Sequence, residues 1–292
     1  MPETAPSASV RPRRSALYMP ASNARAVDKA RSLPCDVVIL DLEDSVGPDL
    51  KAQARKQAVE AVQAGGFGSR GLAVRVNGLD TPWGRDDLLA LQGLHLDAIV
   101  APKVSSAAEV HAYDALILGE MSLWTMVESC AALFQLDAMG ACAATTRLSA
   151  WIIGPNDLAR EMRCRLDETR APLLPALALA VAAARAHGLS IWDGVFNAID
   201  DDAGFERQCI QGRDFGFDGK TLIHPRQIEI ANRAFGPSSD ELDWSRRILA
   251  AFDAPENSGQ GALRVDGRMV ERLHLDEARH LLAMERAILG AA

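Results

Sequence analysis

The segment VVILDLEDSV, residues 37–46, places four apolar residues directly before three carboxylates. Val37 to Leu40 has the β-branched, apolar composition of a strand that is buried on both faces of a parallel sheet. Side chains alternate along a strand, so Asp41 and Glu43 share one face, and Asp44 falls where the strand leaves the sheet. Three acids at the end of a buried strand repel one another unless a cation, an arginine or solvent relieves them. The segment therefore predicts either a binding site or a polar exit loop with a helix cap.

Seven further short apolar segments accompany this one, and their starts are separated by 21 to 42 residues. Such gaps suit a helix with two loops and are too long for hairpins. The eight predicted strands are residues 15–19, 36–42, 71–77, 98–104, 123–127, 148–154, 190–195 and 219–224.

Helical patterns fill the gaps between these segments. Asn23, Asp49 and either Ser105 or Ser106 can each cap a helix, and residues 173–186 form an Ala- and Leu-rich helical stretch. Alternating strands and helices imply a parallel sheet, and eight such units favour a closed (β/α)₈ TIM barrel. An open doubly wound sheet is the alternative, but it normally has fewer strands, and its dinucleotide-binding form would carry a GxGxxG motif that this chain lacks.

The composition is that of a globular protein, with 48% hydrophobic and 24% charged residues among 292. The net charge of −8 and the lack of a Lys/Arg block argue against nucleic acid as a partner. Five scattered cysteines without a CxxC pair predict reduced thiols and a cytoplasmic location. No apolar run approaches the length that spans a bilayer, so we expect no membrane partner.

The sequence predicts three parts. Residues 1–12 lack the apolar stretch of a signal peptide and are predicted to be a disordered lead-in. Residues 13–235 are predicted to form a barrel that carries the catalytic site. Beyond residue 235 the strand pattern stops, and residues 236–292 are predicted to form a helical arm or lid that packs on the barrel or on a neighbouring subunit.

Polar or charged side chains follow seven of the eight predicted strands, at the end where barrel enzymes carry their chemistry. A barrel mouth that converges on a ligand explains them together. They are Glu43, Asp44, Arg75, Asn77, Lys103, Glu128, Asp157, Asp193 and His224.

Carboxylates without clustered His or Cys favour a hard cation such as Mg²⁺. We expect Glu128 and Asp157 to be its direct ligands, although a loop ion pair for Glu128 and a helix N-cap for Asp157 are structural alternatives. A buried Arg75 needs an anion, which a substrate carboxylate or a salt bridge to Glu43 or Asp44 would supply, and both can hold. No G-x-S-x-G element or P-loop is present to support serine hydrolysis or ATP chemistry.

Nine motifs match a known family in order from residue 14 to residue 274: RSALYMPASN, VVILDLEDSV, VRVNGLDTPWG, IVAPKV, MVES, GPNDLA, DGVFN, GFDGKTLIHPRQI and DGRMVERLH. On these motifs the chain resembles the CitE-like branch of the HpcH/HpaI aldolase and citrate lyase β-subunit superfamily. The resemblance implies a TIM barrel that forms homo-oligomers, commonly trimers, with Mg²⁺ at the barrel mouth. It also implies CoA or acyl-carrier thioesters as substrates.

The resemblance also assigns roles to individual residues. Glu128 and Asp157 would bind the metal, and Glu43 and Asp44 would orient its waters. The carboxylate of the oxo-acid portion would bind to Arg75. The remaining substrate-binding residues by this assignment are Arg14, Lys103 and His224, with Arg14 and His224 near the path of the nucleotide or pantetheine.

Two positions depart from the family pattern. The family's lyases and thioesterases usually carry an Asp near the C-terminus that reaches a neighbouring subunit's site as an acid or base, and here that position is Glu271. Asp266 is a less favoured substitute. In MVES, Ser129 replaces the usual Thr and retains the hydroxyl.

The resulting hypothesis is a Mg²⁺-dependent carbon–carbon lyase. It would act on a 3-hydroxyacyl-CoA such as malyl-, citramalyl- or citryl-CoA, and produce acetyl-CoA or a homologue and a 2-oxo acid, with Glu271 as the possible base. The alternatives are a citrate lyase β-subunit acting on an acyl-carrier thioester within a complex, a class II aldolase acting on free hydroxy acids, and a ligand-binding relic without activity.

Overall fold

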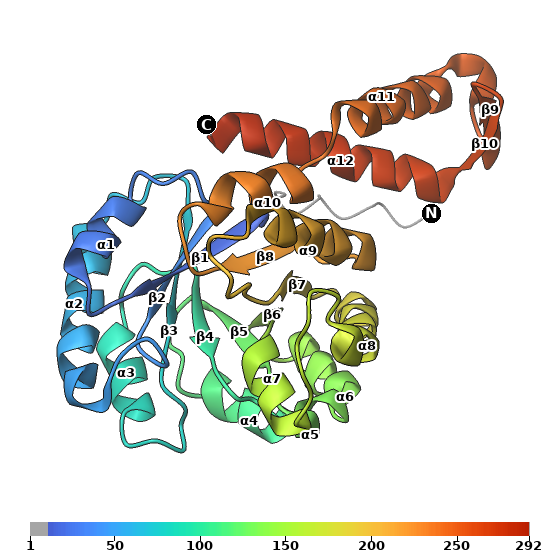
Figure 1. The fold of residues 1–292 in the computed structure, drawn as a ribbon. Coiled ribbons are helices and arrows are strands. Elements are labelled where there is room, and N and C mark those ends of the chain that lie inside the picture. Colours follow the sequence, from blue (N-terminus) through green and yellow to red (C-terminus); the bar gives the residue numbers. More distant parts are fainter. Residues whose placement is uncertain (1–10, 292) are drawn as a thin grey trace. The chain divides into compact units, whose positions relative to one another are not determined.

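The computed structural model describes residues 11–291 and contains a closed barrel of eight parallel strands with helices around it (Figure 1). Each strand pairs with the next in sequence, and β8 pairs with β1 to close the barrel. The predicted fold class is confirmed. The strands are β1 Ser15–Pro20, β2 Val37–Asp41, β3 Gly71–Arg75, β4 Ala98–Ala101, β5 Ser122–Val127, β6 Leu148–Ile153, β7 Ser190–Asp193 and β8 Gly219–Leu222.

The helices of this unit lie between the strands in sequence. They are α1 Ala24–Ala30, α2 Lys51–Ala64, α3 Gly84–Leu91, α4 Ala107–Asp114, α5 Cys130–Leu133, α6 Leu136–Ala141, α7 Pro155–Met162, α8 Leu174–Ala186, α9 Asp202–Phe215 and α10 Gln227–Phe235, with short 3₁₀ turns η1 Pro48–Leu50, η2 Cys142–Ala144 and η3 Ala171–Leu173. Two predicted N-caps are confirmed, because the side chains of Asn23 and Ser106 accept bonds from Ala26 N and Glu109 N. Asp49 does not cap α2, since it lies inside η1 and Leu50 takes the cap position.

Strand alternation divides the apolar side chains into two layers. One buried cluster fills the barrel interior and includes Ile39, Val100, Trp124, Ile152 and Trp192. A larger cluster joins the outward faces of the same strands to the surrounding helices. A side chain near the carboxyl end of a strand therefore points either into the barrel mouth or into the layer between strands and helices, depending on its position in the alternation.

The residues from 236 onward form a second compact unit. It contains α11 Ser239–Asp253, η4 Pro255–Asn257, the antiparallel hairpin β9 Ala262–Val265 and β10 Arg268–Glu271, and α12 Arg272–Ala291. The prediction that no strands follow residue 235 was wrong. Asp266 and Gly267 form the turn of the hairpin. Both have a positive φ, 48° and 81°, which is the backbone conformation that a two-residue Asp-Gly turn requires.

The predicted helix over residues 238–252 is confirmed, and Ser238 and Glu241 form a capping box at its start. Ten of the twelve residues of the predicted lead-in lie outside the described part of the chain. Among residues 11–291, no helix combines the length and apolar character needed to cross a membrane.

The seam between β8 and β1 offers a test of barrel closure. A Cβ on Gly219 would collide with the carbonyl oxygens of Arg13 and Arg14, which directly precede β1. We expect Gly219→Ala to lower the free energy of unfolding by about 3 kcal/mol, because the backbone of two paired strands must separate. Chemical denaturation followed by circular dichroism measures the change.

Gly47→Ala is the matched control. Gly47 has φ −63°, and a Cβ added there would meet no atom within 4 Å, so an Ala is expected to leave stability unchanged or to raise it by about 0.5 kcal/mol. Equal stabilities for the two variants would contradict the role of Gly219 in closing the barrel.

Candidate active site

A cavity of about 350 Å³ opens at the carboxyl ends of the strands. Its charged wall is formed by Asp41, Asp44, Arg75, Glu128 and Asp157. Apolar residues, among them Met126, Ile153, Val195 and Ile223, line other parts of it. The structure thus brings four of the predicted strand-end residues, together with Asp41, to one concave surface, as expected for a barrel mouth.

The buried pair of Arg75 and Asp41 anchors the charged wall. Arg75 Nε and Nη2 donate to Asp41 Oδ1 and Oδ2 at 2.6 and 2.7 Å, and the two residues are register partners on neighbouring strands. Both side chains are at most 9% exposed. Burial by itself would raise the pKa of Asp41, but the charge and hydrogen bonds of Arg75 outweigh it and lower the pKa to about 2. Arg75 was predicted to need an anion, and its main partner is Asp41. Glu43 and Asp44 were the partners considered from the sequence instead.

The third guanidinium nitrogen of Arg75 faces the other acids. Its Nη1 lies 3.0 Å from Glu43 Oε2, 3.8 Å from Asp44 Oδ2 and 3.6 Å from the sulfur of Met126. Because Nε and Nη2 are bonded to Asp41, Nη1 is the end of the guanidinium that a ligand in the cavity can share.

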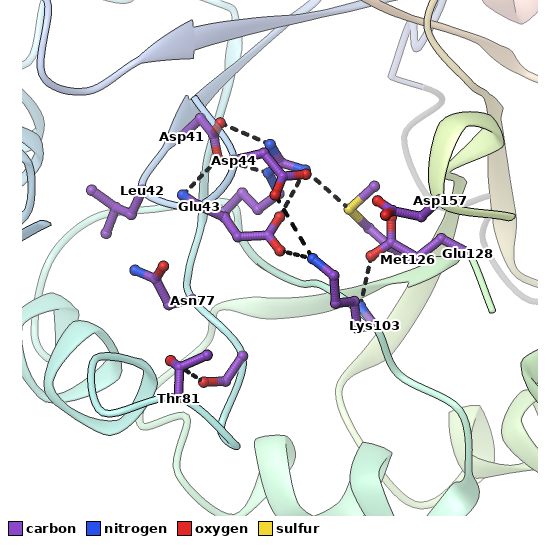
Figure 2. A network of polar contacts seen from close by, with 12 residues as sticks. Asp41, Leu42, Glu43, Asp44, Asn77, Thr81, Lys103, Met126, Glu128 and Asp157 are labelled. Carbon is purple, nitrogen blue, oxygen red and sulfur yellow. Dashed lines mark hydrogen bonds and ion pairs between the residues drawn. The ribbon is translucent and has the colours of Figure 1, made fainter. Parts of the chain in front are cut away.

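Lys103 links two acids from opposite sides of the network (Figure 2). Its ammonium pairs with Glu43 and lies 3.8 Å from Asp44, and its backbone N–H donates to Glu128 Oε1 at 2.7 Å. Lys103 has a left-handed backbone, φ 54°, which is uncommon for a residue other than glycine and costs free energy. Lys103 was predicted to bind substrate. In the structure its ammonium faces the carboxylates of Glu43 and Asp44.

Glu128 carries the least balanced charge of the site. It is 3% exposed, and burial together with the nearby Glu43 raises its pKa to about 7, against the weaker effects of the Lys103 N–H and Arg75. The lack of a side chain at Gly154 makes room for Glu128. A Cβ on residue 154 would collide with the Oε2 and Cβ atoms of Glu128. A buried carboxylate in this condition is stabilised by a bound cation.

Asp157 lines the same cavity, and Figure 2 shows it beside Glu128, across the network from Asp41. It lies in the first turn of α7 and pairs with the exposed Arg160 at 2.7 Å through Oδ1, while Gly154 takes the N-cap position. Glu128 and Asp157 could together hold a hard cation. Within residues 11–291 no group of three or more His, Cys, Asp or Glu side chains is arranged for a metal, so such an ion would complete its shell with water and ligand oxygens, as Mg²⁺ commonly does.

Hydrogen bonds with Asp41 and Lys51 hold the loop after β2, which carries Glu43 and Asp44. The carboxylate of Asp41 accepts bonds from Glu43 N and Ser45 N at 2.9 and 3.1 Å. The buried ammonium of Lys51, from α2, donates to the carbonyl oxygens of Leu42 and Glu43 at 2.8 and 2.7 Å. These bonds hold Glu43 in place against the repulsion of its neighbours.

Two predicted substrate-binding residues do not reach the cavity. Arg14 precedes β1, at the amino ends of the strands, where it forms a bidentate pair with Asp36. His224 is not among the cavity-lining residues, and its Nδ1 accepts a bond from Arg226 N in the turn before α10. Their predicted roles near the nucleotide or pantetheine stay predictions.

Two further strand-end residues have structural partners instead. Asp193 points into the layer between strands and helices, where it pairs with Arg170 and Lys220, each at 2.6 Å. Asn77 donates to Asp87 at 2.6 Å. The inference that all seven strand ends converge on the mouth was therefore too broad. Glu271 ends β10 in the C-terminal unit, and its role stays a prediction.

Sequence reasoning missed Tyr18, which lines the cavity beside Arg75. The guanidinium carbon of Arg75 lies 4.7 Å from the centroid of the Tyr18 ring. Strand alternation was a usable signal, because Tyr18 lies two residues from Ala16 and two from Pro20, which both face inward from β1.

The Asp41–Arg75 pair makes stability depend on pH in a defined direction. The pKa of Asp41 is about 2 in the folded chain, below its ordinary value of 3.8, so its contribution is complete above about pH 4 and is lost as the pH falls through 2. We expect Asp41→Asn to cost about 3 kcal/mol at pH 7, because Arg75 loses its buried partner. The difference from wild type is expected to shrink by roughly 2 kcal/mol on full acidification.

Urea unfolding of wild type and Asp41→Asn across this pH range measures both effects. Asp28→Asn, at an aspartate that is 75% exposed, is the control and is expected to change stability by less than about 0.5 kcal/mol. A difference between wild type and Asp41→Asn that stays constant on acidification would show that this carboxylate does not have a lowered pKa.

Comparison with known proteins agrees with this architecture. The chain is 48% identical to a (3S)-malyl-CoA thioesterase of Cereibacter sphaeroides over 95% of this chain and 96% of the relative. It is 36% identical to an L-malyl-CoA/beta-methylmalyl-CoA lyase of the same species over 97% and 98%. Among solved structures, CitE of Mycobacterium tuberculosis in complex with magnesium, acetoacetate and coenzyme A is similar, with a TM-score of 0.73, 28% identity and coverage of 94% of this chain and 97% of that one.

The model of the HpcH/HpaI aldolase/citrate lyase family matches residues 14–225, which span the barrel from just before β1 to just after β8. This match covers more than half of the chain and includes every polar residue that lines the cavity. The relatives are enzymes, named as thioesterases and lyases of malyl-CoA compounds. The chain belongs to the HpcH/HpaI aldolase/citrate lyase family.

Proposed function

We propose that this enzyme hydrolyses the CoA thioester of a short 3-hydroxy dicarboxylic acid, with malyl-CoA as the simplest example, and that it requires Mg²⁺. The observation that carries the proposal is the pairing, within one cavity, of a cation-seeking carboxylate, Glu128, with a buried guanidinium, Arg75. The first can recruit a metal, and the second can bind a substrate carboxylate.

Several relatives support hydrolysis as the reaction. Proteins that are 46–48% identical over 95% of this chain are named (3S)-malyl-CoA thioesterases, whereas those named L-malyl-CoA/beta-methylmalyl-CoA lyases are 36–37% identical. Hydrolysis adds one water across the bond between the carbonyl carbon and sulfur and yields malate and free CoA. The reaction therefore needs an anchored acyl group and a carboxylate that can accept a proton from water.

The side chains at the mouth suit these tasks. Arg75 Nη1 is the part of the guanidinium left to anchor the distal carboxylate of the acyl group. Asp44 is 59% exposed and lines the cavity, so it can meet both solvent and substrate, and we assign it the role of general base. Glu43 is paired with Lys103 and Arg75, and we assign it the role of positioning these two side chains.

Glu128 and Asp157 would hold the Mg²⁺ ion. The ion would supply a Lewis acid that polarises an oxygen of the bound substrate. The solved CitE structures in complex with magnesium and pyruvate, or with magnesium, acetoacetate and coenzyme A, support magnesium as the ion. Lys103 N–H and the space above Gly154 keep the Glu128 carboxylate in one orientation.

Carbon–carbon cleavage is the second candidate. Glu128 and Asp157 would hold the cation there as well. Removal of the hydroxyl proton would break the bond between the carbinol carbon and the carbon next to the thioester, releasing a 2-oxo acid and the thioester enolate, which takes up a proton to become acetyl-CoA. The lyases with 36–37% identity favour it. Glu271 remains the predicted acid or base for either reaction, and the cytoplasmic location, the homo-oligomer and the role of residues 236–292 as a lid also remain predictions.

The metal assignment predicts a stability effect that needs no substrate. Millimolar Mg²⁺ is expected to raise the melting temperature of wild type by a few degrees, because a ligand that binds only the folded state stabilises it. Glu128→Gln and Asp157→Asn are each expected to abolish that rise. Asp137→Asn, at an aspartate that is 97% exposed, is the control and should keep it.

Differential scanning fluorimetry with and without EDTA measures these shifts. A rise in melting temperature that survives in both Glu128→Gln and Asp157→Asn would place the cation elsewhere in the molecule.

The reaction itself is tested by identifying its products. We expect wild type with Mg²⁺ to convert (3S)-malyl-CoA to malate and CoA, and Arg75→Lys to lower kcat/KM by about 100-fold, since an ammonium cannot bond Asp41 and the substrate in the geometry of the guanidinium. Mass spectrometry of malyl-, methylmalyl-, citramalyl- and citryl-CoA reactions measures the products. Glyoxylate and acetyl-CoA in place of malate would establish the lyase instead, and turnover of none of them would reject both.

A further inference from the structure

The described side chains that line the cavity include six with a hydrogen to donate, and most of these already have a partner. Arg75 is bonded to Asp41 and paired with Glu43. Asn156 and Asn197 bond each other at 2.8 and 3.4 Å, and Thr221 donates to the carbonyl of Asp193 at 3.1 Å. A ligand that used Arg75 or Thr221 would have to break or share an existing bond. Each asparagine amide keeps a second N–H, but both residues are exposed, so water competes for it.

The two remaining donors differ in their surroundings. Ser45 is exposed at the rim, where water competes for its hydroxyl. Tyr18 is only partly exposed, and its hydroxyl donates to the sulfur of Met126 at 3.8 Å. A thioether is a weak acceptor, so redirecting this O–H to a ligand oxygen costs little.

The Tyr18 hydroxyl also keeps its proton. Burial raises the pKa of Tyr18 above its ordinary value despite the opposing effect of Arg75, and Asp41, Glu128 and Glu43 act in the same direction as burial. The phenol is therefore a hydrogen-bond donor throughout the neutral pH range.

The depth of Tyr18 identifies which part of a substrate it can meet. In the β1–β2 ladder Tyr18 pairs with Ile39, two residues before the Pro20–Asp41 pair that borders the mouth. A cavity of about 350 Å³ takes a four-carbon acyl group and leaves the bulk of a CoA carrier outside. The acyl group thus enters with its distal end first, and that end arrives at Arg75 and Tyr18, which are stacked at 4.7 Å.

We propose that Tyr18 is a specificity-determining residue, whose hydroxyl leaves Met126 and donates a hydrogen bond to the distal carboxylate of the bound acyl group beside Arg75. The inference rests on the proposed function for the substrate class only. It gives the site a second, neutral donor for the carboxylate and explains how the enzyme would reject an acyl-CoA that ends in a methyl group, because the partly buried hydroxyl would gain no strong acceptor.

Calorimetric titration of free acids into the Mg²⁺-loaded protein tests this inference without turnover. The ligands are (S)-malate and (R)-3-hydroxybutyrate, which has the same spatial configuration and carries a methyl group in place of the carboxylate next to the carbinol carbon. Tyr18→Phe removes only the hydroxyl, and we expect it to weaken malate binding by about 10- to 100-fold, the usual range for a hydrogen bond to a charged group. Binding of 3-hydroxybutyrate, weak in wild type, is expected to be unchanged.

The matched control is Tyr113→Phe, at the chain's second and last tyrosine. Its hydroxyl accepts a bond from Leu79 N at 3.2 Å, outside the cavity, so the same chemical change there should leave the affinity for malate at its wild-type value. Melting temperatures of both variants show whether each is folded.

Each outcome decides the inference. Malate affinity within twofold of wild type in Tyr18→Phe would overturn it, as would an equal loss for both ligands, which indicates a structural role. Absence of malate binding to wild type would overturn it as well. The proposed function is judged separately by the products from malyl-CoA, so a protein that binds malate through Tyr18 but leaves the thioester intact would reject the function and keep the inference.

Discussion

The bidentate pair of Arg75 and Asp41 is the constraint on which the rest of the site depends. A guanidinium and a carboxylate buried at neighbouring strand positions satisfy each other's charge, and the carboxylate also bonds the backbone of the loop that follows. The pair therefore determines both where Arg75 presents its remaining nitrogen and where Glu43 and Asp44 stand. A buried ion pair is weak evidence for stability, so we assign this pair the role of positioning these groups.

An excess of negative charge around that pair gives the mouth its chemistry. Burial raises the pKa of both Glu43 and Glu128, but Glu43 is paired with Lys103 and Arg75, whereas Glu128 receives one backbone hydrogen bond. The imbalance is local, at the carboxylate that Gly154 accommodates. A cation would relieve it, and a bound cation together with Arg75 would favour an anionic, oxygen-rich acyl group. In the proposed function, metal binding and substrate choice thus follow from one charge distribution.

The sequence was sufficient for the barrel because its eight strands are short apolar runs separated by capped helices. The sequence also predicted which acidic residues lie at the barrel mouth, but it did not predict which residues they pair with. Pairing Asp41 with Arg75 depends on the register of β2 against β3, which alternation along one strand does not specify. Alternation did contain two unused signals: Asp193 follows the inward-facing Trp192 and so points outward, and Tyr18 shares the inward face of β1 with Ala16. The Asp-Gly turn of the C-terminal hairpin was a third.

Anomalous diffraction from crystals grown with malate, and with Mn²⁺ in place of Mg²⁺, tests most directly whether Glu128 and Asp157 hold the cation while Arg75, held by Asp41, faces the acyl group. We expect one anomalous peak in contact with carboxylate oxygens of Glu128 and Asp157, and a malate carboxylate bonded to Arg75 Nη1. A peak bound elsewhere, or malate bound away from Arg75, would contradict this arrangement.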